Sequence, residues 1–252
     1  MDFPLDPKQL EDLDTLVPEL CSIKEPDVEK INFLIIPDEL NSESAELFGL
    51  AFSSVEKKQY RQIYLITDTL LTLDPTPKIY IPDSQDEIFT QHQPAVESLL
   101  QLQSNGALFT TNQIDIAFTK HFKDVLPFIR YLFPDVEICP ILTNCSTAAQ
   151  ILEKFAGLQF TSDDLIIFVG SLSSGLTKAE ALDNDTSVLG HLLSQDGVIR
   201  ISQTRFANIL NTACKLSFAM NLRSRKYGYK CTKQNGRSLI QVKGMCAFGY
   251  YI

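Results

Sequence analysis

The segment Asn32–Leu40, with the sequence NFLIIPDEL, constrains the fold of this chain more than any other segment. Its apolar run Phe33–Ile36 has no polar side chain on either face, which is typical of an internal strand covered on both sides. Pro37 ends this run, and Asp38 follows it directly. Because open α/β sheets bind ligands at the carboxyl ends of their strands, Asp38 stands where chemistry is expected.

Further apolar runs of strand length alternate with segments of helical periodicity. Strands are predicted at Ile63–Thr67, Lys78–Ile81, Val136–Leu142 and Asp164–Val169. Helices are predicted at Glu43–Val55, Ala95–Leu102, Thr119–Phe133, Ser146–Phe155 and Thr177–Ser194. This alternation predicts an α/β fold, a three-layer sandwich with a mixed central sheet, and residues 1–252 are expected to form a single domain.

The last quarter of the chain predicts two short helices and a hairpin. The helices are expected at Gln203–Asn211 and Lys215–Leu222, on either side of a break that includes Cys214. Tyr227–Thr232 and Ser238–Tyr250 are predicted to pair as the final β-hairpin.

Composition and segment lengths indicate a cytoplasmic protein. The amino terminus lacks the basic and apolar regions of a signal peptide, and the longest apolar runs are too short to cross a membrane. The six cysteines show no C-x-x-C spacing, which argues against a zinc cage or a disulfide framework and fits a reducing compartment.

The charge is unevenly distributed along the chain. Residues 197–252 contain ten Lys and Arg residues and no acid, whereas residues 1–196 carry 12 bases and all 31 acids, a net charge of −19. A basic terminal segment can be a nucleic-acid footprint, but the acidic remainder would repel a phosphate backbone. We therefore expect the basic segment 197–252 to dock on the acidic body or to form a solvated face, and we expect no nucleic-acid partner.

Two carboxylates follow predicted strands, Asp38 after the first and Asp68 after the second. If the strands are neighbours, the two side chains can approach each other and bind a divalent cation or share a proton. The alternative is that each aspartate only bonds the backbone of its own turn, as aspartates commonly do after strands.

The segment Gly170–Gly175 joins a predicted strand to a predicted helix, a geometry in which backbone amides bind anions. Its candidate binding residues are Gly170, Ser171, Ser173, Ser174 and Gly175. The residues that follow are Leu176 and Thr177, so the phosphate loop of nucleotide-binding enzymes is incomplete. The serines also lack the first glycine of a nucleophile elbow, which argues against a serine hydrolase.

Cys214 is the cysteine that best fits a reactive thiol, because it lies at the predicted break between two helices. A thiol near a helix amino terminus can have a lowered pKa. The alternative is that Cys214 is a small buried apolar residue, as most free cysteines are.

Seven short segments match one known pattern in order along the chain. They are Phe3–Leu10, Ile35–Asp38, Leu65–Leu70, Leu126–Phe128, Tyr131–Leu142, Phe168–Gly175 and Asn211–Cys214. In this order they resemble the Memo family, which includes the bacterial AmmeMemoRadiSam system protein B. The corresponding family segments include F-Y-P-A-D-P-x-x-L, I-x-P-H-A-G-Y, L-P-F-L, F-P-D-x-x-I-x-P-I-L and S-D-F-S-H-Y-G. The likeness spans nearly the whole chain.

The resemblance implies a fold like that of class III non-haem iron dioxygenases. It also implies a pocket at the strand ends in which histidines and a cysteine bind a metal, with a proposed redox role.

This chain departs from the family at nearly every position of that pocket. The family's histidine, aspartate and glycine positions are occupied here by Asp38, Thr69, Leu70, Ser171, Ser174 and Lys215, and His121 lies one place out of register. Only Cys214 keeps the family's residue type. Because leucine has no donor atom and imidazole is the preferred ligand of copper, iron and zinc, we expect no bound cofactor. At most, Asp38 and Cys214 would hold a divalent metal weakly.

These observations lead to three hypotheses of function. The first is a Memo-like cytoplasmic protein that has lost the metal site and serves as a non-catalytic binding or scaffold module for a protein partner. The second is a metal- or thiol-dependent redox enzyme with a rebuilt site around Asp38 and Cys214. The third is a phosphate or nucleotide binder at Gly170–Gly175.

Overall fold

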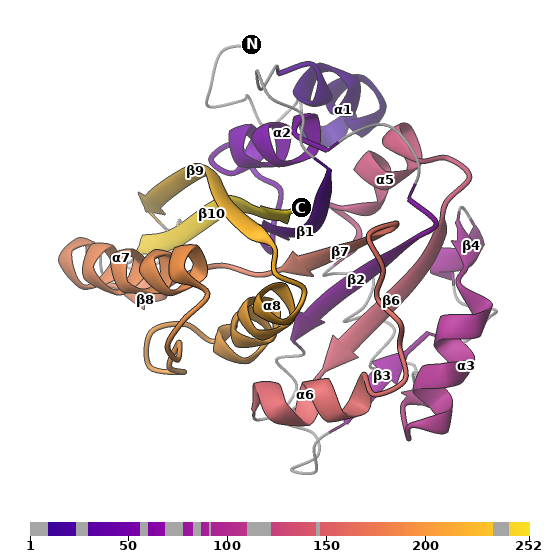
Figure 1. Ribbon diagram of the computed structural model, residues 1–252. Helices are drawn as coiled ribbons and strands as arrows, with labels where there is room; N and C mark the ends of the chain where they lie inside the picture. The colour runs from indigo at the N-terminus through magenta and orange to yellow at the C-terminus, as the bar shows by residue number, and fades with distance from the viewer. Residues whose placement is uncertain are drawn as a thin grey trace.

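Strands from both ends of the chain meet in one mixed β-sheet (Figure 1). A computed structural model describes residues 10–23, 30–55, 60–68, 78–82, 87–90, 92–109, 122–144, 147–233 and 242–252. Its strands are β1 (Ile31–Ile36), β2 (Gln62–Asp68), β3 (Ile79–Ile81), β4 (Gln93–Pro94), β5 (Leu108–Phe109), β6 (Glu137–Thr143), β7 (Asp164–Val169), β8 (Ser174–Leu176), β9 (Arg223–Lys233) and β10 (Val242–Tyr251).

The helices connect these strands and cover the sheet. They are α1 (Leu13–Cys21), α2 (Ala45–Ser53), α3 (Val96–Ser104), α5 (Leu126–Leu132), α6 (Ala148–Lys154), α7 (Lys178–Ser194) and α8 (Ala207–Ala219), together with the short 3₁₀ helix η2 (Glu87–Thr90). None of the helices in these described ranges combines the length and the apolar character needed to cross a lipid bilayer.

The centre of the sheet is parallel and its margins are antiparallel. The strand order is β5-β3-β6-β2-β7-β1-β10-β8, and β4 pairs with β6 and β9 with β10. Strands β6, β2, β7 and β1 run in the same direction, whereas β10 is antiparallel to β1 and β3 is antiparallel to β6. The carboxyl ends of β1, β7 and β2 therefore lie side by side at one edge, as the predicted sandwich with a mixed sheet requires.

Helices cover both faces of the sheet, which explains the uninterrupted apolar strands. Along β1, Leu34 and Ile36 pack with α1, α2 and α5, while Phe33 and Ile35 pack with α3, α6, α7 and α8. In Figure 1 the first group includes α1 and α2 above the sheet, and the second includes α6 and α8 below it. Because successive side chains of a strand point to opposite faces, each apolar residue of β1 reaches one of two cores.

Three of the predicted helices differ from the observed ones, namely the one around Pro127 and the two on either side of Cys214. The helix expected over Thr119–Phe133 is observed as α5, Leu126–Leu132, and Pro127 lies in its first turn. Proline is tolerated there because the amide that it lacks would have no partner within the helix, so Pro127 lies in the first turn of α5 instead of kinking a longer helix. Residues 119–121 lie outside the described residues.

The predicted break at Cys214 is wrong. A single helix, α8, runs from Ala207 to Ala219, and Cys214 lies in its interior. The segment contains no glycine or proline that would end a helix, and Thr212 bonds back to the carbonyl of Asn208 within the helix at 2.8 Å.

Candidate functional site

The register of β1 and β7 brings Asp38 and Ser171 together. Ile36 is level with Val169 at the carboxyl ends of these parallel strands. The pairing continues beyond the strands, because the amide of Gly170 donates to the carbonyl of Ile36 at 2.9 Å. Asp38 lies two residues after Ile36, and Ser171 lies two residues after Val169, so the two side chains meet. The Ser171 hydroxyl donates a hydrogen bond to Asp38 Oδ1.

Two basic side chains also contact the Asp38 carboxylate. Lys243 Nζ lies 2.6 Å from Asp38 Oδ1, and Arg205 Nη2 donates to Asp38 Oδ2 at 2.6 Å. The side chain of Asp38 is 5% exposed and that of Lys243 is 10% exposed, whereas the Arg205 side chain is 42% exposed. We call these four residues, Asp38, Ser171, Arg205 and Lys243, the Asp38 ion cluster.

The cluster keeps Asp38 in its charged form. Burial on its own raises the pKa of a carboxyl group, because the interior solvates a charge poorly. At Asp38 this effect is outweighed by the charge of Lys243, by the hydrogen bonds from Lys243 and Ser171, and by the charge of Arg205, so its pKa is lowered. Both carboxylate oxygens thus have close donors or cations.

Arg205 is positioned by the turn that precedes α8. The hydroxyl of Thr204 donates to the carbonyl of Ser171 at 2.8 Å and accepts from the amide of Phe206 at 3.1 Å. The guanidinium carbon of Arg205 lies 4.6 Å from the centre of the Phe206 ring. The turn is therefore fixed to the loop after β7, and its arginine extends along an aromatic face toward Asp38.

Lys243 is the one charged residue in the strand β10, whose sequence is VKGMCAFGYY. The neighbouring Gly244 accepts a hydrogen bond from the amide of Leu172 at 2.9 Å and donates to the carbonyl of Ser173 at 3.0 Å. These bonds place Lys243 beside the loop after β7. A lysine that is buried in an apolar strand is stabilised by a nearby acid, and this pattern is the sequence signal that could have pointed to the cluster.

Asp68 ends β2 at the same edge of the sheet and is electrostatically coupled to Arg205. Burial raises its pKa to about 7, and the nearby charge of Arg205 opposes that rise. Asp38 and Asp68 therefore stand at the same edge of the sheet, but β7 separates their strands, so the neighbouring strands that the sequence considered are not observed. Their pKa values shift in opposite directions. The difference arises because Asp38 has direct bonds to both cations.

The segment Gly170–Gly175 does not form the predicted anion loop at a helix amino terminus. Ser174 begins the short strand β8, and α7 starts only at Lys178. The amide of Gly170 donates to a β1 carbonyl and the amide of Leu172 to a β10 carbonyl, so both are already satisfied by the backbone. The Gly170 amide extends the pairing of β7 with β1, whereas the Leu172 amide is bonded because β10 runs beside the loop.

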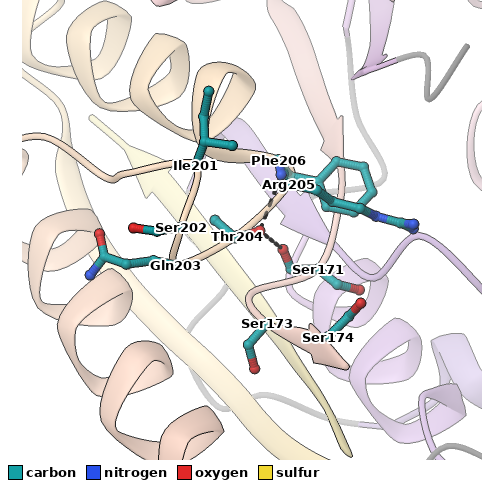
Figure 2. A pocket seen from close by; sticks show the side chains of 9 residues that line it. All are labelled: Ser171, Ser173, Ser174, Ile201, Ser202, Gln203, Thr204, Arg205 and Phe206. Carbon is teal, nitrogen blue, oxygen red and sulfur yellow. Dashed lines mark hydrogen bonds between the residues drawn. The ribbon is translucent and has the colours of Figure 1, made fainter. Parts of the chain in front are cut away.

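The serines of this segment nevertheless line a pocket of about 200 Å³ next to the Asp38 ion cluster (Figure 2). Its lining residues are Ser171, Ser173, Ser174, Ile201, Ser202, Gln203, Thr204, Arg205 and Phe206. Figure 2 shows the segment after β7 facing the segment 201–206, with Arg205 extending out of the pocket on the side of Ser171 and Ser174. The lining is rich in hydroxyl groups, includes one guanidinium group and contains no carboxylate.

Cys214 lies away from this site. Its sulfur is 3.5 Å from the hydroxyl of Tyr250, and burial raises the pKa of the thiol. Tyr250 is level with Phe33, which lies three residues before the end of β1, or about 10 Å at the spacing of a strand. Asp38 lies beyond that end. The structure therefore does not bring Asp38 and Cys214 into one site, and Cys214 lacks the lowered pKa expected near a helix terminus.

The residues present do not fit the metal that the family resemblance implies. Within the described ranges, no three His, Cys, Asp or Glu side chains gather as a metal-binding group. The Asp38 oxygens face an ammonium and a guanidinium, which repel a divalent cation. Thr69, Leu70 and His121 lie outside the described residues.

We expect Asp38→Asn to destabilise the fold by about 3 kcal/mol, because it leaves the buried ammonium of Lys243 without its main counter-ion. The double variant Asp38→Asn/Lys243→Met should recover much of this loss. Urea unfolding of the single and double variants measures the coupling. Asp163→Asn, which removes the exposed pair between Lys30 and Asp163, is the control and should change little. Additive effects of Asp38 and Lys243 would contradict the cluster.

The raised pKa of Asp68 predicts a dependence of stability on pH. Between about pH 4 and the folded pKa of about 7, the unfolded chain loses the Asp68 proton while the folded chain keeps it, so stability falls as pH rises. Asp68→Asn removes this loss. The variant should gain stability relative to the wild type between about pH 4 and pH 8, by up to roughly 4 kcal/mol. A pH-independent difference in urea unfolding would contradict this assignment.

Comparison with models of protein families and with curated protein sequences gave no match to this chain. Its functional interpretation therefore rests on the geometry of the strand ends and on the sequence pattern. That geometry consists of a charged aspartate saturated by the chain's own cations and, beside it, a pocket rich in hydroxyl groups.

Proposed function

We propose that this protein is a Memo-like, non-catalytic binding module, with a fold like that of class III non-haem iron dioxygenases. One observation carries the proposal: the strand-end position at which such a fold would bind its metal is occupied by the Asp38 ion cluster. An aspartate whose two oxygens already contact two cations is a poor metal ligand and a poor general base. The parallel order β6-β2-β7-β1, which places these ends together, is compatible with the proposed fold.

The geometry gives less support to the rival hypothesis, a redox enzyme rebuilt around Asp38 and Cys214. Cys214 is buried in the interior of α8, and its nearest polar partners are the Tyr250 hydroxyl and the carbonyl of His191. A reactive thiol is normally partly exposed and stabilised as the thiolate by a positive neighbour. Neither condition holds at Cys214, where burial raises the thiol pKa.

Metal loading tests the proposal directly. We expect purified protein incubated with iron, copper or zinc and then desalted to retain far less than one metal ion per chain, because Arg205 and Lys243 occupy the site. The measurement is elemental analysis, with calorimetric titration of each metal. The double variant Arg205→Met/Lys243→Met, which removes the repelling cations, is the informative comparison. Stoichiometric, tightly held metal in the wild type would overturn the proposal.

The pocket beside the cluster favours a second candidate function, the binding of a small oxyanion such as phosphate. The expected ligand is again phosphate, as for the segment Gly170–Gly175, but the groups that would bind it are side chains instead of backbone amides. Since the amides of Gly170 and Leu172 are already bonded, the ligand would be held by serine hydroxyls, and the charge of Arg205 at the edge of the pocket would attract it. Hydroxyl and guanidinium donors without a competing carboxylate in the lining suit an anion.

Phosphate should raise the melting temperature of the wild type beyond the effect of chloride at equal ionic strength. A ligand present at about 100 times its Kd stabilises the folded state by about 2.7 kcal/mol. The variant Ser202→Ala/Gln203→Leu, which changes the lining and leaves the ion cluster intact, should lose most of this shift. Gln103→Leu/Ser104→Ala, which makes the same two changes at exposed positions of α3, is the control. Equal shifts in all three proteins would exclude binding at this pocket.

A further inference from the structure

The strand β9 forms a long edge of the sheet. It pairs with β10 along its whole length, from Arg223 opposite Tyr251 to Lys233 opposite Val242. On its other side β10 is already paired with β1 and β8. Within the described residues, β9 pairs with no strand other than β10, and Figure 1 shows it at the margin of the sheet. An edge strand presents a row of backbone groups to which another extended chain can pair.

The β9 edge is strongly basic. Its cations are Arg223, Arg225, Lys226, Lys230 and Lys233, and its sequence, RSRKYGYKCTK, contains no acid. Two of these cations have partners within the chain: Lys230 lies 2.7 Å from Glu46, and Arg225 lies over the ring of Tyr227. Arg223, Lys226 and Lys233 are exposed. The edge therefore carries surplus positive charge on a protein whose net charge is −9.

The cations occupy both faces of the strand. Residues opposite each other in a ladder point to the same face, so Lys230 shares the face of Met245, on the side of α2. Lys226 shares the face of Phe248, on the side of α7 and α8. A strand added to β9 would therefore meet positive charge on both of its side-chain rows.

The positive charges of β9 determine which kind of added strand can pair with this edge. Like charges directly opposite one another in a ladder are destabilising, and lysines on an edge are a common protection against unwanted pairing. The basic edge thus disfavours pairing with the same edge of a second copy. It favours an extended chain that carries acids, since opposite charges across a ladder are stabilising.

We propose that β9 is a docking edge for an acidic, extended peptide segment of a protein partner, which adds to the sheet as a further strand beside Arg223–Lys233. This inference rests on the proposed binding function and names the chemistry of the partner. Backbone hydrogen bonds along β9 supply affinity, and the charges of β9 select acidic sequences. Nucleic acid fits less well because it has no amide and carbonyl ladder to continue the sheet, and the acidic body repels its phosphates.

A fluorescent peptide of alternating glutamate and valine, about as long as β9, is the probe, and fluorescence anisotropy at low salt measures its binding. The variant Lys226→Glu/Lys233→Glu should weaken binding at least about tenfold. The control Arg200→Glu/Lys215→Glu makes the same change in net charge at exposed residues outside β9, and it should weaken binding less than about twofold.

A second comparison separates strand addition from simple charge attraction. The same peptide is then N-methylated at consecutive central residues, so that neither edge of the peptide strand can donate backbone hydrogen bonds there. It should bind at least about tenfold more weakly. Hydrogen exchange should show protection of β9 amides by the unmodified peptide. Equal binding of both peptides, equal loss in both double variants, or tighter binding of a single-stranded oligonucleotide would each overturn the proposal. The metal-loading result does not depend on β9, so this inference and the loss of the metal site fail separately.

Discussion

The contact between the Asp38 carboxylate and two basic side chains depends on segments that lie far apart in the sequence. Asp38 follows β1, Ser171 follows β7, Arg205 precedes α8 and Lys243 belongs to β10. Burying a carboxylate costs several kcal/mol unless its partners are well placed, so all four segments must be in register before the contact becomes favourable. The cluster therefore links the parallel centre of the sheet to its antiparallel margin.

That requirement limits what the strand ends can do. In an open α/β sheet the carboxyl ends of the strands are the usual place for a ligand, and the register of β1 and β7 does present Asp38 there. Here the chain's own cations fill the position. A ligand must either displace Arg205, which is the most exposed member of the cluster, or bind beside it, where the serines and Thr204 line the adjoining pocket. The geometry therefore agrees better with a ligand that binds beside the cluster than with a reaction at the buried Asp38 carboxylate.

Local sequence patterns predicted the strands and the position of Asp38, because an apolar run ended by proline already defines a buried strand and its end. The apolar sequence around Lys243 indicates that this lysine needs an acidic partner, but the meeting of Lys243 and Arg205 with Asp38 depends on contacts between distant segments, which no local pattern contains. The strand β8 also depends on a distant segment, because Ser174 and Leu176 at the end of this loop pair with β10. The helix break predicted at Cys214 is wrong because nothing in the local sequence ends α8 there.

These contacts explain part of the uneven distribution of charge along the chain. From the sequence, the basic segment 197–252 is expected either to dock on the acidic body or to form a solvated face. Each of these interpretations applies to different residues of the segment. Arg205 and Lys243 dock on Asp38, and Lys230 pairs with Glu46, so part of the excess charge neutralises the acidic body. Lys226 and Lys233 remain exposed along β9. These exposed cations are available to an acidic partner from outside the chain.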